Sequence, residues 1–223
     1  SQVNYNRIIQ MVSSHCASTA VMLSAHQSIG VPQPLKMFGT KEQKEKFLPR
    51  LAKGEVSAFA LTEPDVGSDP SKMTTTAVLD KDGETYIING QKLWISNGPI
   101  ADLLIVMART NDPSEERPEI TAFVVEGNSE GLSTAHRCDF MGLKGLQNGL
   151  LSFDNVRVPK ENIVEGLGRG LALALRTLNT GRLTLPAACG GAMKQALEMV
   201  VDWTEERKQW GAAIGHHEAV ANR

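Results

Sequence analysis

Two short segments carry side chains that suit a planar polar ligand. The segment ALTEPDVGSD, residues 60–69, ends in turn-forming residues, as a strand does when it leads into a loop that can approach a ligand closely. The later segment WIS places Trp94 and Ser96 two residues apart. In a strand, side chains at this spacing point to one face, so an indole plane and a hydroxyl would lie side by side. Such a surface favours a flat heterocycle.

Other kinds of site have weaker support. Gly166, Gly168 and Gly170 precede a helical segment, but the dinucleotide pattern G-x-G-x-x-G fails because residue 171 is leucine, so we interpret them as a turn into that segment. His216 and His217 would point about 100° apart on a helix, which is poor geometry for a shared metal. There is no G-x-S-x-G motif for a nucleophilic serine. We therefore assign no metal ligand.

Composition places the chain among ordinary globular proteins. It has 223 residues, 41% of them hydrophobic and 22% charged, with a net charge of −2. That charge does not favour a nucleic acid or membrane-surface partner. No apolar run reaches membrane-spanning length, and the first residues do not resemble a secretory leader. Three scattered cysteines without a C-x-x-C motif predict free buried thiols in a reducing, intracellular compartment.

The hydrophobic pattern divides the chain into three parts and predicts an α+β fold. Residues 1–56 are predicted to be helical: an apolar series recurs at steps of three and four, prolines interrupt residues 30–39, and Thr40 begins another helix as the first residue of a capping box with Gln43. The series consists of Ile8, Val12, Cys16, Thr19 and Leu23.

Residues 57–160 are predicted to form an antiparallel β-barrel or sandwich. Two strand-like runs, residues 85–90 and 91–96, meet at Asn89-Gly90, and this dipeptide is a strong signal for a hairpin turn. A polar, proline-containing loop is expected over residues 111–119. Further strands are expected at residues 103–108, 120–126 and 149–158.

Residues 161–223 are predicted to be helical again, with one helix over residues 171–178 and a second from Asn179 past Arg207. Pro186 is tolerable near the first turn of that second helix, where amide protons lack partners. Ala196, Val200, Trp203 and Arg207 would share one face of it, the first three packing inward or against a partner.

Five segments, in order, make the chain resemble the acyl-CoA dehydrogenase family. Each is similar to the family segment expected at its place, and the match covers essentially the whole chain. The segments are TEPDVGSD, INGQKLWISNG, MGLKGLQNGLLSFDNVRVPKENIV, LNTGRLTLPAA and EERKQWG.

The resemblance implies a flavoenzyme of fatty acid and lipid metabolism. Family members use FAD to oxidise an acyl-CoA thioester to the trans-2-enoyl-CoA: a glutamate removes an α proton, and the β hydrogen leaves as hydride to the flavin. The electrons pass to an electron-transfer flavoprotein. The resemblance also implies a homodimer or homotetramer, in the cytoplasm of a bacterium or the mitochondrial matrix of a eukaryote.

The resemblance further implies which residues would touch ligands. Ser68, Asn179 and Arg182 would contact the acyl-CoA, and Arg207 would reach the FAD pyrophosphate of a neighbouring subunit. Residues implied for FAD binding are Phe59, Leu61, Thr62, Gly67, Ser68, Trp94, Ile95, Ser96, Arg207 and Gln209.

The catalytic base has no candidate in this sequence. One family location for the base corresponds to Gly181, which has no side chain that could take a proton, and the other would lie beyond Arg223. The chain is thus expected to be a fragment lacking the first helices and most of the C-terminal helical domain, with no catalytic residue of its own. A non-catalytic binding or assembly protein is the alternative, and an oxidase that uses oxygen is a further one.

Overall fold

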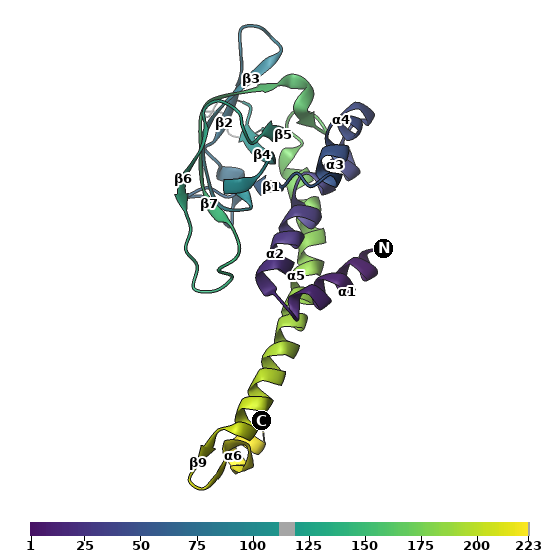
Figure 1. The fold of residues 1–223 in the computed structure, drawn as a ribbon. Coiled ribbons are helices and arrows are strands. Elements are labelled where there is room, and N and C mark those ends of the chain that lie inside the picture. The colour runs from purple at the N-terminus through teal and green to yellow at the C-terminus, as the bar shows by residue number, and fades with distance from the viewer. Residues whose placement is uncertain (112–118, 223) are drawn as a thin grey trace.

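Helices from both ends of the chain gather on one side of a sheet formed by the middle of the chain in the computed structural model, which describes residues 1–111 and 119–222 (Figure 1). The predicted loop over residues 111–119 lies almost entirely outside the described residues. The helices are α1 (Gln2–Ser13), α2 (Ala17–Ser24), α3 (Pro32–Phe38), α4 (Lys41–Ala52), α5 (Gly170–Glu206) and α6 (Glu218–Ala221), with a π-helical turn at Ala25–Ile29. The strands are β1 (Ser57–Ala60), β2 (Thr76–Leu79), β3 (Thr85–Ser96), β4 (Leu103–Arg109), β5 (Ile120–Glu126), β6 (Leu132–Arg137), β7 (Asn148–Pro159), β8 (Ile163–Val164), β9 (Lys208–Gln209) and β10 (Ala212–Ala213).

The N-terminal helices differ in detail from the prediction. The apolar series from Ile8 to Leu23 is divided between α1 and α2, because Cys16 has extended backbone angles and begins α2 as its N-cap. Pro32 lies in the first turn of α3, where proline needs no hydrogen-bond partner, so the interrupted stretch contains a short helix. The capping box of Thr40 and Gln43 at the start of α4 is confirmed.

The sheet is mostly antiparallel and folds into two layers. Its strand order is β6-β7-β3-β2-β4-β5-β8, and β1 pairs with β4 in parallel. This order has two ends, β6 and β8, so the described strands form no closed barrel. Side chains of β3 and β7 pack against those of β1, β4 and β5 in one apolar core, as in a sandwich.

The predicted hairpin at Asn89-Gly90 is wrong. β3 runs unbroken through this dipeptide, with a bulge in its pairing to β7 between Ile88 and Gly90. Gly90 has φ +142°, and a Cβ there would lie 2.6 Å from Thr75 Oγ1. The glycine therefore serves a bulge and a close approach of two strands, which also favour glycine. The hairpin lies earlier, between β2 and β3.

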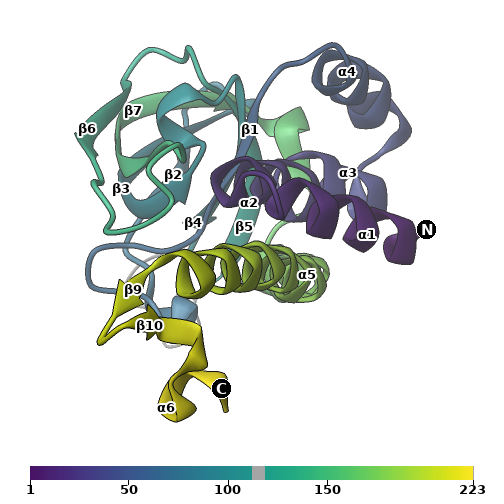
Figure 2. The same cartoon turned by 60° about the horizontal axis from the view of Figure 1, so that its bottom comes forward.

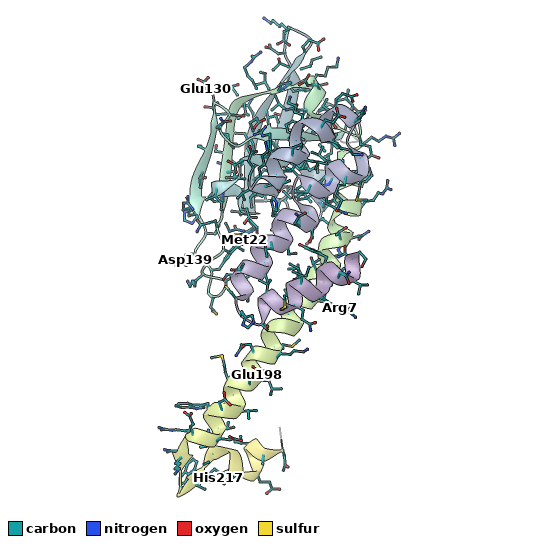
Figure 3. The ribbon with its side chains drawn as sticks, turned by 45° about the vertical axis from the view of Figure 1, so that its right-hand side comes forward. Arg7, Met22, Glu130, Asp139, Glu198 and His217 are labelled. Atoms are coloured by element: carbon teal, nitrogen blue, oxygen red, sulfur yellow. The ribbon has the colours of Figure 1, made fainter. Side chains whose placement is uncertain are left out.

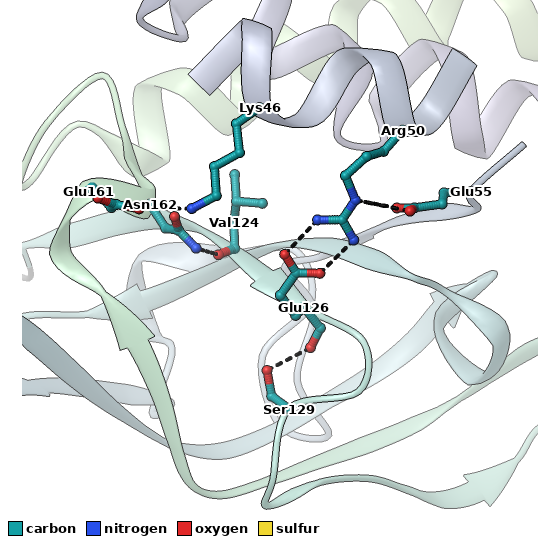
Figure 4. Close-up of polar contacts among 8 residues, drawn as sticks. All are labelled: Lys46, Arg50, Glu55, Val124, Glu126, Ser129, Glu161 and Asn162. Atoms are coloured by element: carbon teal, nitrogen blue, oxygen red, sulfur yellow. Dashed lines mark hydrogen bonds and ion pairs between the residues drawn. The ribbon is translucent and has the colours of Figure 1, made fainter. Parts of the chain in front are cut away.

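A second core joins the other face of β4 and β5 to α3, α4 and α5. Polar contacts clamp α4 over the sheet (Figure 4). Arg50 makes two hydrogen bonds to Glu126 at the end of β5, of 2.7 and 2.8 Å, and its Nε also contacts Glu55 at 2.9 Å. Because these contacts are bidentate, they fix the orientation of α4 on the sheet.

A single helix, α5, covers the region in which two helices were predicted. α5 has 37 residues and continues through Pro186, which corresponds to about 55 Å at about 1.5 Å per residue. α1 packs closely against its middle: Ser13 Oγ donates to the Ala188 carbonyl at 2.6 Å, and a Cβ at Gly191 would lie 2.1 Å from the Gln10 carbonyl oxygen. This contact supports the helix across the proline.

The distal half of α5 projects away from the rest of the molecule (Figures 1 and 2). Glu198 and His217 lie on this projecting part (Figure 3). Val200 and Trp203, expected to pack inward, are 56% and 57% exposed. Arg207 has extended backbone angles and follows the last helical residue, so it does not continue the predicted stripe.

Two further expectations concern cysteines and membranes. The three cysteines are free, but Cys16 and Cys189 are exposed and Cys138 is half-buried, so the expectation of buried thiols is wrong. Cys16 is the extended N-cap residue before α2, and Cys189 lies on a solvent-exposed side of the long helix α5. Among the described helices, none combines the length and apolar character that a membrane span requires.

Candidate functional site

A cleft of about 380 Å³ lies where the end of β1, the loop after it, β3 and α5 meet. Its size falls within the range of about 300–1,000 Å³ that is usual for ligand sites. A larger hollow of about 750 Å³ is formed by side chains of α4 alone, so it lacks converging elements. The cleft is lined by Ile29, Phe59, Leu61, Thr62, Gly67, Ser68, Pro70, Trp94, Ile95, Leu175, Leu178 and Arg182.

The structure brings most of the sequence-predicted ligand residues together in this cleft. Phe59 is the third residue of β1 and is mostly buried at its floor. Leu61 and Thr62 follow as the chain leaves the strand, and the exposed Gly67 and Ser68 form the rim. A Cβ added at Gly67 would meet no atom within 4 Å, so the loop faces open space at that point. These segments offer an apolar floor with a polar rim.

Trp94 forms one wall through a break in its strand. The pairing of β3 with β7 is irregular between Lys92 and Ile95, and Trp94 has φ +61°, a left-handed conformation that is uncommon for a bulky residue. The bulge leaves the indole 54% exposed while Ile95 beside it is buried. Backbone strain of this kind gathers at functional sites, so it supports a role in binding.

Ser96 is the last residue of β3 and follows Ile95, which lines the cleft, but Ser96 itself is not part of the lining. Its hydroxyl accepts a hydrogen bond of 3.1 Å from Asn148 Nδ2 on β7. No acceptor for the Ser96 hydroxyl proton is found among residues 1–111 and 119–222, so this proton is available to a ligand. Asn148 Oδ1 is buried without a partner, which adds an unsatisfied acceptor next to it.

A buried ion pair lies directly beneath the cleft loop, and sequence reasoning missed it. Lys92 on β3 is fully buried and Glu63 is 3% exposed. Their Nζ and Oε1 atoms are 2.8 Å apart. A signal existed, since Lys92 is in phase with the alternating apolar residues Tyr86 and Ile88, which are buried. A lysine, however, is almost never buried unless it is paired.

Burial and the partner's charge act in opposite directions on the pKa of each of these two groups. Burial alone would raise the pKa of Glu63, but the Lys92 ammonium and the hydrogen bonds from Lys92, Thr75 and Thr74 outweigh it and lower the pKa to about 2. Burial lowers the pKa of Lys92, and the Glu63 carboxylate opposes this only in part. Glu63 is therefore a firmly ionised carboxylate at neutral pH.

α5 closes the cleft on the remaining side. Arg182 is exposed at the cleft and donates from Nη1 to Asn179 Oδ1 at 2.7 Å, so these two predicted substrate residues lie together. A Cβ on Gly181 would lie 2.8 Å from Ile29 Cγ2, so this buried position has little room for a side chain. No Asp or Glu side chain lines the cleft in the described part of the chain.

Two predicted residues lie far from the cleft. Arg207 and Gln209 follow the distal end of α5, where β9 pairs with β10 (Figure 1). The helix axis from Arg182 to Glu206 is roughly 36 Å long. Both residues therefore belong to another region of this chain's surface and cannot join this cleft within one subunit.

Three family models match consecutive parts of the chain. The N-terminal domain of acyl-CoA dehydrogenases matches residues 1–55, the middle domain matches residues 58–156, and the C-terminal domain matches residues 168–223. The cleft is lined by residues from all three matched parts.

Named relatives agree with these matches. The probable acyl-CoA dehydrogenase FadE10 of Mycobacterium tuberculosis (strain ATCC 25618 / H37Rv) is 54% identical over 100% of this chain and 34% of its own length. The human mitochondrial very long-chain specific acyl-CoA dehydrogenase is 43% identical over 94% of this chain and 33% of its own. The crystal structure of an acyl-CoA dehydrogenase complexed with FAD from Bacillus anthracis matches with a TM-score of 0.88 and 36% identity, covering 96% of this chain and 36% of that one. The chain thus spans about a third of the length of these two curated relatives.

Proposed function

We propose that this chain, which belongs to the acyl-CoA dehydrogenase family, binds FAD in the cleft between β1, β3 and α5 and serves the oxidation of an acyl-CoA thioester to the trans-2-enoyl-CoA. The observation that carries the proposal is the convergence of Trp94, Thr62, Ser68 and Arg182 from three separate elements on one cleft. An exposed aromatic plane, an apolar floor and a polar rim fit a flavin ring with its polar edge.

The residues take distinct roles in this proposal. FAD, when bound, supplies the two-electron acceptor for the acyl chain. Phe59, Leu61 and Ile95 form the apolar floor, and Trp94 stacks beside the ring. The Ser96 hydroxyl keeps its proton for the ring edge because it accepts from Asn148. Gly67 leaves space for close approach of the phosphates or the CoA, since nothing lies within 4 Å of its missing side chain.

The acyl-CoA would enter along α5. Arg182 is held by Asn179 and offers its remaining guanidinium donors to a carbonyl or phosphate oxygen of the substrate. Ser68 on the opposite rim contributes a hydroxyl. Arg207 and Gln209 are proposed to reach the FAD of a neighbouring subunit in a homodimer or homotetramer, because within one subunit they are too far from the cleft.

The remaining assignments also belong to the proposal. Electrons would pass to an electron-transfer flavoprotein. The domain divisions proposed are 1–56, 57–160 and 161–223. The relatives include a bacterial and a mitochondrial enzyme, and we propose the bacterial cytoplasm or the mitochondrial matrix as the compartment.

A non-catalytic binding protein is the second candidate, favoured by one observation. The cleft has no carboxylate in its described lining, so no side chain there can remove the α proton. In the dehydrogenase proposal the whole protein provides that base from residues outside this chain.

A titration with FAD followed by acyl-CoA tests both candidates. We expect the chain to form a yellow complex and the whole protein to be bleached by acyl-CoA without air. The 223-residue chain alone should bind FAD but show no turnover with an artificial electron acceptor. FAD binding without bleaching of the whole protein by any acyl-CoA would favour the non-catalytic candidate. Absence of FAD binding would reject both roles for the cleft.

A further inference from the structure

The ion pair of Lys92 and Glu63 reaches both ends of the loop that lines the cleft. Lys92 Nζ donates to Glu63 Oε1 at 2.8 Å and to the Leu61 carbonyl oxygen at 3.1 Å, at the point where the chain leaves β1. The adjacent amide, Leu93 N–H, donates to the Thr62 carbonyl oxygen at 2.8 Å. The strand that carries Trp94 is thus fastened to the first residues of the loop.

The Glu63 carboxylate fastens the other end of the same loop. Its Oε2 accepts from the backbone N–H and hydroxyl of Thr74 at 2.7 and 2.8 Å, and its Oε1 accepts from the Thr75 N–H at 3.0 Å. Glu63 and Val66 also exchange two backbone hydrogen bonds, which close a tight turn. Gly67 and Ser68 follow this turn at the rim of the cleft.

Stability alone does not account for a pair of this kind. Removing two charges from water costs as much as their mutual attraction returns in many proteins, so a well-packed apolar pair would hold the fold equally well. What an apolar pair lacks is directed hydrogen bonding. Here Lys92 donates a hydrogen bond to the Leu61 carbonyl oxygen at the start of the loop. Glu63 accepts hydrogen bonds from the backbone N–H groups of Thr74 and Thr75 at the end of the loop.

We propose that the Lys92–Glu63 pair is a positioning element, which holds the loop from Leu61 to Thr75 in its ligand-binding conformation before the flavin arrives. The inference rests on the proposed function, since it names what prepares that same cleft for FAD. Preorganisation of this kind strengthens binding because the ordering cost is met during folding. Neither residue lines the cleft, so both act through the loop.

Amide hydrogen exchange of the unmodified chain without FAD is the first test. We expect the amides of Glu63, Thr75 and Leu93 to exchange as slowly as those in the pairing of β3 with β7. If they exchange as fast as amides of open loops and slow down only when FAD is added, the ligand orders the loop and the inference is wrong. This measurement needs no variant and is decisive even if the variants below fail to fold.

Two variants of the full chain give the second test. Lys92→Met removes the ammonium and leaves a buried carboxylate, and Lys92→Met with Glu63→Gln removes both charges, which avoids an isolated buried charge. For each, we expect the Kd for FAD to rise by about tenfold or more at a temperature where circular dichroism shows a folded chain. The visible absorption band of the flavin in the saturated complex should shift as well, which a loss of fold stability alone would not cause.

Arg50→Met is the matched control, because Arg50 pairs with Glu126 and Glu55 away from the cleft. It should lower stability but leave the Kd for FAD and the flavin band unchanged. Wild-type affinity and spectrum in the folded double variant would overturn the inference while leaving the proposed function intact. If the wild-type chain itself binds no FAD, the proposed function fails, and hydrogen exchange still decides whether the loop is ordered without a ligand.

Discussion

The ring centroids of Trp94 and Phe140 lie 5.8 Å apart, with an angle of 33° between the planes. Phe140 comes from the loop between β6 and β7, so a segment more than forty residues away in the sequence covers part of the indole. Contact with Phe140 limits the rotation of Trp94, whose other surface borders the cleft.

Replacing Trp94 with alanine should weaken FAD binding. Loss of an aromatic stack costs about 0.5–1.5 kcal/mol beyond the loss of buried area. Phe140→Leu should produce a smaller loss, because it loosens the indole without removing it. Isothermal titration with FAD measures both. Val78→Ala is the control, since Val78 is 63% exposed on β2 and does not line the cleft. Equal FAD affinity for Trp94→Ala and Val78→Ala would show that Trp94 is not part of the site.

The decrease in the free energy of unfolding at acid pH should depend on Glu63. Its pKa in the folded chain is about 2, below its ordinary 4.5, because of Lys92 and the threonine hydrogen bonds that overcome burial. A carboxyl with a lowered pKa in the folded state stabilises that state above its ordinary pKa, and this contribution is lost as the pH falls from 4.5 toward 2. Urea unfolding at several pH values should show a steeper fall of the free energy of unfolding in the wild type than in Glu63→Gln. Parallel curves for the two chains would contradict the assignment.

Gly90→Ala should destabilise the fold by about 1–3 kcal/mol, because it combines backbone strain with a steric clash. At φ +142° an added Cβ would lie 2.7 Å from the Thr75 Cα, which is backbone and cannot rotate away. Thr75 also donates to Glu63, so the substitution should increase the Kd for FAD. Gly83→Ala is a useful comparison: Gly83 also has a positive φ but has no atom within 4 Å of the added Cβ. If thermal melts show the same decrease in melting temperature for both substitutions, backbone strain alone explains the effect and the steric clash at Gly90 contributes nothing.

Arg207→Lys should reduce FAD retention only in an assembled protein. The guanidinium suits a pyrophosphate in a bidentate way that an ammonium does not, and Arg207 lies beyond the far end of α5 from its own cleft. Gel filtration combined with flavin absorbance measures retention and assembly together, and circular dichroism should be unchanged. A monomer that retains FAD as firmly as the assembled form would exclude a contact between subunits.

Local sequence signals predicted the elements that do not depend on distant contacts. The Thr40–Gln43 capping box and the apolar runs of β4, β5 and β7 needed only their own residues and are confirmed. Asn89-Gly90 misled because the same dipeptide suits a hairpin turn and a bulge, and only Thr75, the residue just before β2, decides between them. Pro186 misled in a similar way, since packing against α1 supports a helix that local propensity would divide.

The site shows the same limit. Strand spacing predicted a ligand-facing role for Trp94, the family resemblance implied one for Thr62, and the fold brings both residues to one cleft. The pairing of Lys92 with Glu63 could not be predicted, because a buried lysine is stable only beside a partner that lies 29 positions away in the sequence. From sequence alone, a charged residue in a predicted strand is expected at the surface, and only the three-dimensional pairing shows that it is buried.

The three-part origin of the cleft has a consequence for how the chain folds. Its walls come from residues near 60, near 94 and near 180, and β1 joins the sheet by parallel pairing with β4. Contacts between such distant segments require the closure of long loops, so they slow folding and form after local structure. Under the proposed function, the FAD cleft is complete only when these contacts have formed, so FAD would bind the native state alone. Supplying the cofactor should therefore raise the melting temperature with its concentration, and chains synthesised with little flavin should have more time to aggregate or be degraded.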